Sequence, residues 1–285
     1  MSNIVILGDT SHDFNFELAD KYGVEMISYY LQMGEDHFKD GVDIDAETFY
    51  ARVNSDMELK TGIPPVSEVL ELLKKLHDER GITEAIAIYS NMNLTGMGSL
   101  YQSISHMQDD VKLYMYESAG VGSITGLYAI LAAKLRDEGK SAEQIMEALE
   151  YYKDKSRIWA IFSDLSYLAR GGRISKAKSV IGNFLHIAPI LTINDGSIDV
   201  LHKVRGQKKS LQVLANEVKN KVGDSKRFYL NIFKGRDEEE FKQFKALMGD
   251  LIDRSELYYE TILSPVLGVH SGPKAVGASV LILDK

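Results

Sequence analysis

The chain has 285 residues, of which 45% are hydrophobic, with a formal net charge of −8 and no cysteine. Its length favours two domains, and its negative charge disfavours non-specific nucleic-acid binding, which depends on lysine and arginine neutralising phosphates. The lack of cysteine excludes disulfides and thiolate metal sites. No apolar run approaches membrane-spanning length, and the first residues lack the basic flank of a signal peptide. We therefore expect a cytoplasmic protein without stable membrane insertion.

The first half of the chain alternates short apolar runs with amphipathic helical patterns, which is typical of a mostly parallel sheet between two helical layers. Pro64 and Pro65 open a predicted helix that Gly81 ends, and a further helix covers 125–138. Ser141 and Gln144 form a capping box for a helix over 142–153. Strands are predicted at 3–7, 24–31, 84–89 and 111–116. These patterns predict a three-layer α/β domain over residues 1–155.

The second half reads as a mixed α/β domain over residues 156–285, with its own, partly antiparallel sheet. The turn residues Asn194 to Ser197 separate two apolar runs and predict a hairpin. The predicted strands are 187–193, 198–204, 227–233, 257–263 and 277–283, with helices at 208–222 and 237–251. We expect a ligand site at the interface between the two domains.

Several loops that follow predicted strands carry hydroxyl, amide or imidazole groups. His270 and Ser271 lie between glycines after the strand at 257–263, and Thr61 and Gly62 lie beside a helix N-terminus, an arrangement that suits an anion. The loop of Asn91, Met92 and Asn93 could offer further donors to the same anion. For the loop of Thr61 and Gly62, ligand binding and helix capping are about equally favoured. His270 taken in isolation, and the loop 91–93 taken alone, are more simply interpreted as structural turns.

Two glycine-rich segments do not match nucleotide-binding motifs. In the segment from Glu117 to Ser123 the third glycine of a dinucleotide fingerprint falls one place late, at Gly126. The segment around Gly171 and Gly172 lacks the lysine-hydroxyl ending of a phosphate-binding loop. Its basic side chains are expected at the surface, either solvated or facing an acidic partner: Arg170, Arg173 and Lys176.

The order of motifs resembles the DegV family of bacterial fatty-acid-binding proteins, which includes the B subunits of fatty acid kinases. The resemblance covers nearly the whole chain. The matching segments are Asp9-Thr10-Ser11, Leu94-Thr95-Gly96, Tyr167-Leu168-Ala169-Arg170-Gly171-Gly172-Arg173-Ile174-Ser175, Pro189-Ile190-Leu191 with Asp195-Gly196, Lys203-Val204-Arg205-Gly206-Gln207-Lys208-Lys209, and Gly268-Val269-His270-Ser271-Gly272-Pro273.

The resemblance implies that a long-chain fatty acid, such as palmitate, stearate or oleate, is buried in a tunnel between the two domains. It implies that the carboxylate is held at Thr61, Gly62, Asn91, Met92, Asn93, His270 and Ser271. We expect the acyl chain to be lined by Ile63, Leu94, Ile181, Phe184, Leu185 and Ile190. The family commonly has Thr-Ser-Gln-Pro-Ser where this chain has Thr61 to Pro65, a serine pair at Asn91 and Met92, and glycine at Lys274.

The resemblance further implies a carrier without catalysis, cofactor or metal, which presents the bound acid to a separate fatty-acid kinase. Arg170, Arg173 and Lys176 would then face the kinase. The alternative is a hydrolase or phosphotransferase with His270 as general base and Ser271, Thr61 or Asp9 nearby. The sequence contains no Gly-x-Ser-x-Gly elbow, no His-Glu-x-x-His pair and no complete phosphate loop, which disfavours that alternative.

Overall fold

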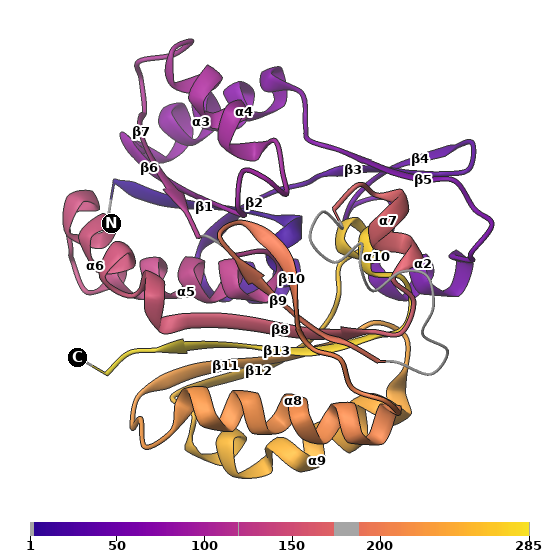
Figure 1. Cartoon of the computed structure of the whole chain (residues 1–285). Helices are drawn as coiled ribbons and strands as arrows, with labels where there is room; N and C mark the ends of the chain where they lie inside the picture. Colours follow the sequence, from indigo (N-terminus) through magenta and orange to yellow (C-terminus); the bar gives the residue numbers. More distant parts are fainter. Residues whose placement is uncertain (1–2, 119, 174–187, 285) are drawn as a thin grey trace.

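The computed structural model describes residues 3–118, 120–173 and 188–284, and shows an α/β protein with two large sheets (Figure 1). The first sheet is parallel, in the order β2-β1-β6-β7. Its strands are β1 (Ile4–Asp9), β2 (Val24–Ile27), β6 (Glu84–Tyr89) and β7 (Lys112–Glu117). This arrangement confirms the prediction of a mostly parallel sheet in the first half of the chain.

Helices cover both faces of the parallel sheet (Figure 1). One face carries α3 (Val66–Arg80) and α4 (Met97–Ser105), and the other carries α1 (Phe16–Tyr22), α5 (Ser123–Asp137) and α6 (Ala142–Tyr151). Strand residues alternate accordingly, since Ile4 and Ile6 pack with α5 whereas Val5 and Leu7 pack with α3 and α4. The capping box predicted at Ser141 is present at the start of α6.

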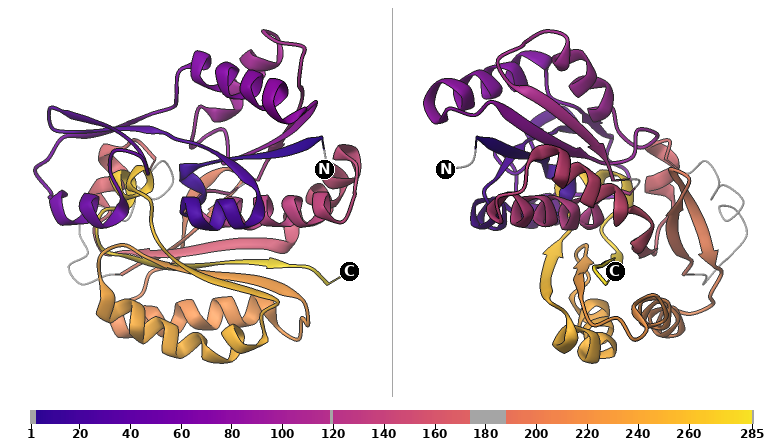
Figure 2. Two further views of the ribbon diagram at one scale, coloured as in Figure 1. Left: turned by 180° about the vertical axis from the view of Figure 1, so that it is seen from behind. Right: turned by 90° about the vertical axis from the view of Figure 1, so that its left-hand side faces the viewer.

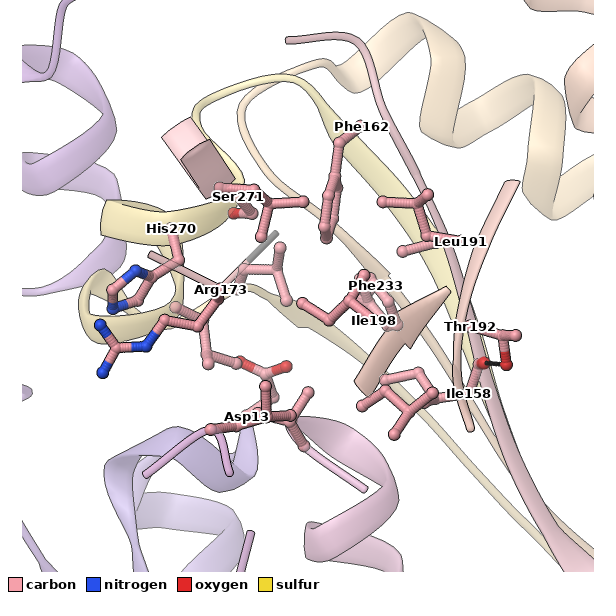
Figure 3. Close-up of a pocket in the computed structure, with 18 residues that line it drawn as sticks. Asp13, Ile158, Phe162, Arg173, Leu191, Thr192, Ile198, Phe233, His270 and Ser271 are labelled. Carbon is pink, nitrogen blue, oxygen red and sulfur yellow. Dashed lines mark hydrogen bonds between the residues drawn. The ribbon is translucent and has the colours of Figure 1, made fainter. Parts of the chain in front are cut away.

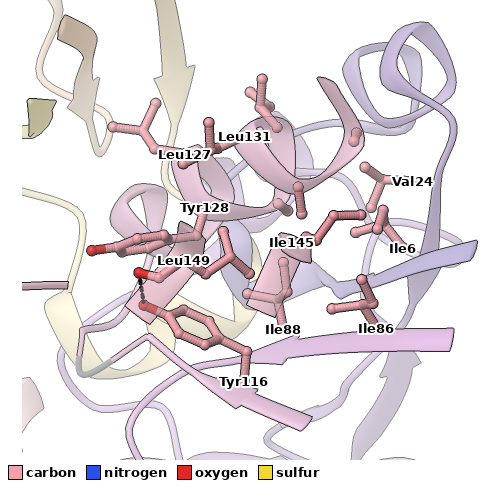
Figure 4. Packing of buried hydrophobic residues seen from close by; sticks show 14 of the residues in the cluster. Ile6, Val24, Ile86, Ile88, Tyr116, Leu127, Tyr128, Leu131, Ile145 and Leu149 are labelled. Atoms are coloured by element: carbon pink, nitrogen blue, oxygen red, sulfur yellow. Dashed lines mark hydrogen bonds between the residues drawn. The ribbon is translucent and has the colours of Figure 1, made fainter. Parts of the chain in front are cut away.

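Helix α5 lies between the two large sheets. Every residue from Ser123 to Ala133 is buried, and the helix contacts β1 and β6 on one side and β13 and β11 on the other. Its hydrophobic cluster, shown in Figure 4, joins residues of the parallel sheet to Tyr229 and Leu281 of the second sheet. One continuous core therefore connects the two halves of the chain.

The second sheet has six strands in the order β10-β9-β8-β13-β11-β12, and only β11 and β12 pair in parallel. The strands are β8 (Ser156–Phe162), β9 (Ile190–Asn194), β10 (Ser197–His202), β11 (Phe228–Lys234), β12 (Leu257–Ile262) and β13 (Ala275–Ile282). Its outer face is covered by α8 (Gln207–Val222) and α9 (Glu238–Arg254). The result is the mixed, partly antiparallel sheet that the sequence predicts.

The hairpin of β9 and β10 forms one edge of this sheet (Figure 2). Its turn residues Asp195 and Gly196 have φ values of 46° and 69°, the left-handed conformations that a two-residue hairpin turn requires. β9 pairs with β8 through only three residue pairs, whereas β8 pairs with β13 through seven. The hairpin is therefore the least anchored part of the sheet.

A third, antiparallel sheet was not predicted. It contains β3 (Tyr30–Met33), β4 (Asp36–Lys39) and β5 (Leu59–Gly62), and α2 (Ala46–Arg52) lies between β4 and β5 in the chain. The predicted strand 24–31 is divided between β2 and β3. This segment packs against α7 (Ser166–Arg170) and α10 (Pro265–Ser271) from the second half, in a cluster that includes Phe49, Tyr167 and Val269.

The loop predicted around His270 is a short helix, α10. Pro265 occupies its first turn, where a missing N–H is tolerated, and Gly272 follows its end with φ of 73°. Two 3-10 turns complete the described elements, η1 (Thr10–His12) and η2 (Lys153–Lys155). All strands of the parallel sheet precede residue 155 and all those of the six-stranded sheet follow it, but the exact domain division stays a prediction. No helix within the described ranges combines the length and apolarity needed to cross a bilayer.

Candidate functional site

Two adjoining cavities lie where loops of the parallel sheet meet α10 and the edge of the six-stranded sheet. The larger has a volume of about 110 Å³ and the smaller about 70 Å³. The described residues common to both linings are Leu94, Val121, Arg173, Leu267 and His270. His270 and Arg173 therefore stand at the junction between the two spaces.

The larger cavity is almost entirely apolar, although Asp13 also belongs to its lining. Side chains of β8 and of the β9–β10 hairpin form much of its wall, and Phe233 and Leu267 contribute from β11 and α10 (Figure 3). The hydroxyl of Thr192 in this wall donates to the carbonyl of Ile158 at 2.7 Å, and that of Ser271 donates to the carbonyl of Gly272 at 3.2 Å. With these hydroxyls occupied by backbone partners, the surface left to a ligand is suited to hydrocarbon.

The smaller cavity is the more polar of the two, although apolar side chains such as Ile63 and Val266 also line it. It is lined by hydroxyl groups of Ser11, Tyr29, Thr61, Ser90 and Thr95, together with the His270 and Arg173 side chains. Thr61 Oγ1 lies 3.0 Å from His270 Nε2, and the Tyr29 hydroxyl bonds to Thr95 Oγ1. Such a group of neutral donors beside one cation is suited to an anionic head group.

These hydroxyls are positioned by the parallel sheet. Ser11 and Ser90 follow the carboxyl ends of the adjacent strands β1 and β6, the edge where open α/β sheets bind ligands. Asp9 Oδ1 accepts bonds from the amide and the hydroxyl of Ser11, at 2.9 and 2.5 Å, and thereby orients that side chain. Ser11 Oγ in turn lies 3.3 Å from Ser90 Oγ.

His270 lies in the last turn of α10 and packs directly on the backbone at Gly171. A Cβ atom at residue 171 would lie 2.2 Å from His270 Nδ1, so only glycine fits there. Burial, with a smaller contribution from the positive charge of Arg173, lowers the pKa of His270 to about 4. The imidazole is therefore neutral at neutral pH and can donate one hydrogen bond and accept another.

The basic residues expected to face a partner occupy different environments. Arg173 is half-buried, lines both cavities and donates to the carbonyl of Gly171 at 2.5 Å. Arg170 is exposed, donates to the carbonyl of Ser55 and stacks over the Tyr167 ring with 4.6 Å to its centroid. Lys176 lies outside the described residues. Sequence reasoning did not anticipate a cation at the junction of the cavities.

The predicted loop 91–93 lies beside the hairpin tip rather than among the described residues that line either cavity. Asn91 Oδ1 accepts from the amide of Asn93 at 2.9 Å. A Cβ at Gly196 would lie 2.4 Å from Asn91 Oδ1 and 2.7 Å from Asn93 Nδ2. Met92 is 48% exposed, and its amide donates to the Glu117 carboxylate at 2.8 Å.

The remaining predicted residues are divided between cavity and core. Gly62 and Ile63 line the smaller cavity, Leu94 lines both, and Ser271 lines the larger. Ile190 is fully buried in the core beneath α8 and α9 and is not among the described lining residues. Ile181, Phe184 and Leu185 lie outside the described residues.

Sequence reasoning missed several residues of the smaller cavity. Ser90 is adjacent to the loop that was singled out, and Ser11 and Thr95 belong to motifs quoted for the family resemblance, so all three carried a local signal. Tyr29 carried none, because its position depends on the unpredicted break between β2 and β3. Among the residues described, no cluster of three or more histidine, aspartate or glutamate side chains could hold a metal ion.

Comparisons with known proteins agree with this architecture. Residues 3–283 match the model of a family described as "Uncharacterised protein, DegV family". A DegV domain-containing protein of Clostridium acetobutylicum is 31% identical over 284 residues, covering 99% of each chain. Another, from Caldanaerobacter subterraneus, is 30% identical, with 97% of this chain and 98% of the relative covered.

Solved structures share the fold. The crystal structure of DegV from Bacillus subtilis, described as a fatty acid binding protein, superposes with a TM-score of 0.90 at 24% identity, covering 99% of this chain and 100% of that one. A stearic acid-binding protein from Eubacterium ventriosum gives a TM-score of 0.86 at 23% identity, with 99% and 98% covered. The family match over nearly the whole chain confirms the resemblance read from the motifs: this chain belongs to the DegV family.

Proposed function

We propose that this protein binds a long-chain fatty acid, with its carboxylate in the smaller, polar cavity and its acyl chain in the larger, apolar one. The observation that carries this proposal is the junction itself, where His270 and Arg173 separate a hydroxyl-lined space from a hydrocarbon-lined space. The descriptions of structural neighbours as fatty acid-binding and stearic acid-binding support the same ligand class.

Hydrocarbon burial supplies the affinity. A sixteen-carbon acid has about 14 methylenes, and at roughly 0.8 kcal/mol each their transfer contributes on the order of 11 kcal/mol before ordering costs. The head group must remain hydrogen-bonded, because an unpaired buried carboxylate would be strongly destabilising. Thr61, His270 and Arg173 are placed to supply those bonds, and the departures from the family pattern at Asn91 and Met92 fall outside the described cavity lining.

We assign the protein a carrier role, without catalysis or a cofactor, in which the bound acid is presented to a separate fatty-acid kinase. Arg170 is exposed next to the segment that places Arg173 at the head-group cavity, so a partner that contacts Arg170 would also lie close to the carboxylate. In this assignment Arg170, Arg173 and Lys176 contribute to the kinase-facing surface.

The competing function is a hydrolase or phosphotransferase that uses His270 as general base. The 3.0 Å contact between Thr61 Oγ1 and His270 Nε2 is the observation in its favour. Against it, a pKa of about 4 makes the imidazole a weak base, and His270 Nδ1 has no hydrogen-bonding partner among the described residues to orient the ring.

Extraction and mass spectrometry distinguish the two functions. The purified protein is denatured, extracted with organic solvent and analysed for lipids. We expect a near-stoichiometric fatty acid. An empty protein that turns over acyl or phosphoryl esters would instead identify an enzyme.

The same assay tests the head-group contact. Because His270→Ala removes a hydrogen bond to a charged group, we expect fatty-acid affinity to fall by about 10- to 100-fold. The melting temperature of the lipid-free protein should change less. His37→Ala, on the exposed strand β4, is the matched control and should bind normally. Unchanged affinity with a large loss of stability would show that His270 is structural.

A further inference from the structure

Helix α10 carries His270, and its N-terminus is not capped by its own residues. The helix has only seven residues, and Ser264 at the N-cap position makes no side-chain capping bond. A helix this short has no independent stability in water, so its position depends on contacts with the rest of the protein. What holds its two ends therefore decides where the imidazole lies.

Two carboxylates from the first half of the chain cap α10 instead. Asp13 Oδ1 accepts from the amide of Ser264 at 3.0 Å, and Asp40 Oδ2 accepts from the amide of Val266 at 3.2 Å. Asp13 follows η1 and Asp40 follows β4, so the two acids reach the helix from separate segments. Acceptors at these amides satisfy donors that a helix N-terminus leaves open, and negative charge there is stabilising.

Both acids make this contact from buried positions, where a charged carboxylate is less stable than it is in water. Asp13 is 2% exposed and Asp40 is 0% exposed, and neither Asp13 Oδ2 nor Asp40 Oδ1 has a hydrogen-bonding partner among the residues that the structure describes. Burial raises the pKa of each carboxyl to about 7. Asp13 also adopts a left-handed backbone with φ of 55°, which is unusual for a residue other than glycine. A solely space-filling role would not require two buried acids here.

Close packing links the capped end of α10 to His270. A Cβ at Gly268 would lie 2.4 Å from the Phe49 ring and 2.9 Å from the Tyr50 hydroxyl, and one at Gly272 would lie 2.6 Å from the Tyr167 ring. The short helix is thus held by packing at its middle and its C-terminal end and by the two carboxylates at its N-terminal end.

We propose that Asp13 and Asp40 are positioning residues for the head-group site, which cap α10 from the first half of the chain and thereby hold His270 within reach of Thr61. This inference rests on the proposed function, because it gives the two acids a role in binding the acyl head group. It also explains how a residue near the C-terminal end of the chain is aligned with hydroxyls that follow β1 and β6.

The test combines substitutions with two readouts, fatty-acid affinity and the titration of His270 by histidine-selective NMR. Asp13→Ala and Asp40→Ala should each lower affinity about tenfold and raise the pKa of His270 from about 4 towards the ordinary 6.5, as the ring becomes accessible to water. Asp13→Asn and Asp40→Asn keep an acceptor oxygen and should stay within about threefold of the parent affinity. Asp237→Ala, which removes the N-cap of α9 on the outer face of the six-stranded sheet, is the control and should leave both readouts unchanged.

A second variant removes the contact from the other side. Ser264 has φ of −57°, which proline adopts without strain, so Ser264→Pro deletes the amide donor to Asp13 and leaves the carboxyl in place. It should reproduce the effects of Asp13→Ala on affinity and on the His270 pKa. This variant keeps the proposal testable if the alanine variants do not fold.

A double-mutant cycle decides whether the acids act through His270. In a His270→Ala background, Asp13→Ala should cause little further loss of affinity, because the group it positions is already absent. A fully additive loss, or an unchanged His270 pKa in Asp13→Ala, would overturn the proposal. If His270→Ala alone bound fatty acid normally, the proposed head-group function would fail, whereas the NMR titration would still report whether the acids position the ring.

Discussion

The two ends of the candidate ligand site are built by different means. The polar end draws its hydroxyls from loops after β1 and β6 of the parallel sheet, together with Tyr29 and Thr61 of the β2–β3 connection and β5. The apolar end consists of the faces of β8 and of the β9–β10 hairpin in the six-stranded sheet. His270 and Arg173 belong to the second half of the chain but stand at the junction. The polar groups are thus gathered from several short segments, whereas the apolar wall is formed mainly by the faces of strands in one sheet.

The largest expected effect concerns Asp13, a buried acid in the lining of the apolar end. The pKa of Asp13 is about 7 in the folded protein against 3.8 as its ordinary value, so the folded state binds more protons than the unfolded state between pH 4 and 7. Stability contributed by this residue therefore falls as pH rises through that window. Residue 13 does not titrate in Asp13→Asn. The free energy of unfolding of this variant, relative to that of the parent, should therefore rise by up to about 4 kcal/mol from pH 4 to pH 8.

Urea unfolding of the lipid-free protein at several pH values measures this difference. Asp45→Asn, at an exposed cap, is the control and should show no comparable gain, because the pKa of that residue is lowered by its bonds to Thr48. A stability difference between Asp13→Asn and the parent that is constant with pH would show that Asp13 is not titrating near neutrality.

Filling the apolar end should abolish acyl binding while leaving the polar end intact. Ala160 on β8 lines the larger cavity, so Ala160→Phe would place a ring where the acyl chain is expected. We expect fatty-acid affinity to fall at least 100-fold, equivalent to roughly 2.7 kcal/mol of lost burial. Ala51→Phe, on the exposed side of α2, is the matched control. Normal binding by Ala160→Phe, measured by isothermal titration, would place the acyl chain elsewhere.

Removing one hydroxyl at the polar end should have a smaller effect. Thr61→Val keeps the shape of the side chain but deletes the bond to His270 and one donor to the carboxylate. A net hydrogen-bond contribution of about 1.5 kcal/mol predicts a loss of affinity of roughly tenfold. Thr48→Val, at the exposed start of α2, should have no effect on binding. Equal losses for short and long fatty acids would locate the effect at the head group, whereas a loss confined to long acids would contradict it.

The smallest effect is expected at the hairpin tip, which contacts the loop that follows β6. Gly196→Ala would bring a Cβ within 2.4 Å of Asn91 Oδ1, so the tip must move away from the loop that follows β6. We expect the fatty acid to dissociate about three- to fivefold faster in a stopped-flow transfer assay, since the wall of the larger cavity is loosened. This corresponds to roughly 1 kcal/mol.

Gly34→Ala is the matched control for Gly196→Ala. Gly34 also has a positive φ, of 65°, but nothing lies within 4 Å of its Cβ position. Both variants carry the same backbone strain, so only Gly196→Ala should change the dissociation rate. Equal changes in the two variants would show that strain, not the contact with Asn91, is responsible.

Local signals account for the parts of the fold that the sequence predicted. The parallel strands, the capping box at Ser141 and the turn at Asp195 and Gly196 each depend on residues close together in the chain. The third sheet was missed because β3, β4 and β5 have four residues each, and β4 (Asp36–Lys39) is largely polar. Helix α10 was read as a loop because Gly268 within it and Gly272 directly after it concealed the role of Pro265 as a helix start.

The candidate site was predicted only in part, because only its locally encoded residues could be recognised in the sequence. Thr61 and His270 stood out because polar side chains among glycines are visible in a sequence, and the structure brings them together. The apolar wall was not identifiable, because strand alternation does not distinguish a cavity from a core. Ile190 and Leu191 are adjacent and both buried, yet Ile190 packs under α8 whereas Leu191 lines the cavity. Only the order of layers in the folded protein separates them.

The position of α5 limits how a ligand can enter. Helix α5 is buried from Ser123 to Ala133 and shares its core with both large sheets. Separating the two sheets would therefore expose this hydrophobic core to water, which is unfavourable. We therefore expect the fatty acid of the proposed function to enter at the edge of the six-stranded sheet, where β9 pairs with β8 through only three residue pairs, while α5 and both sheets stay in place.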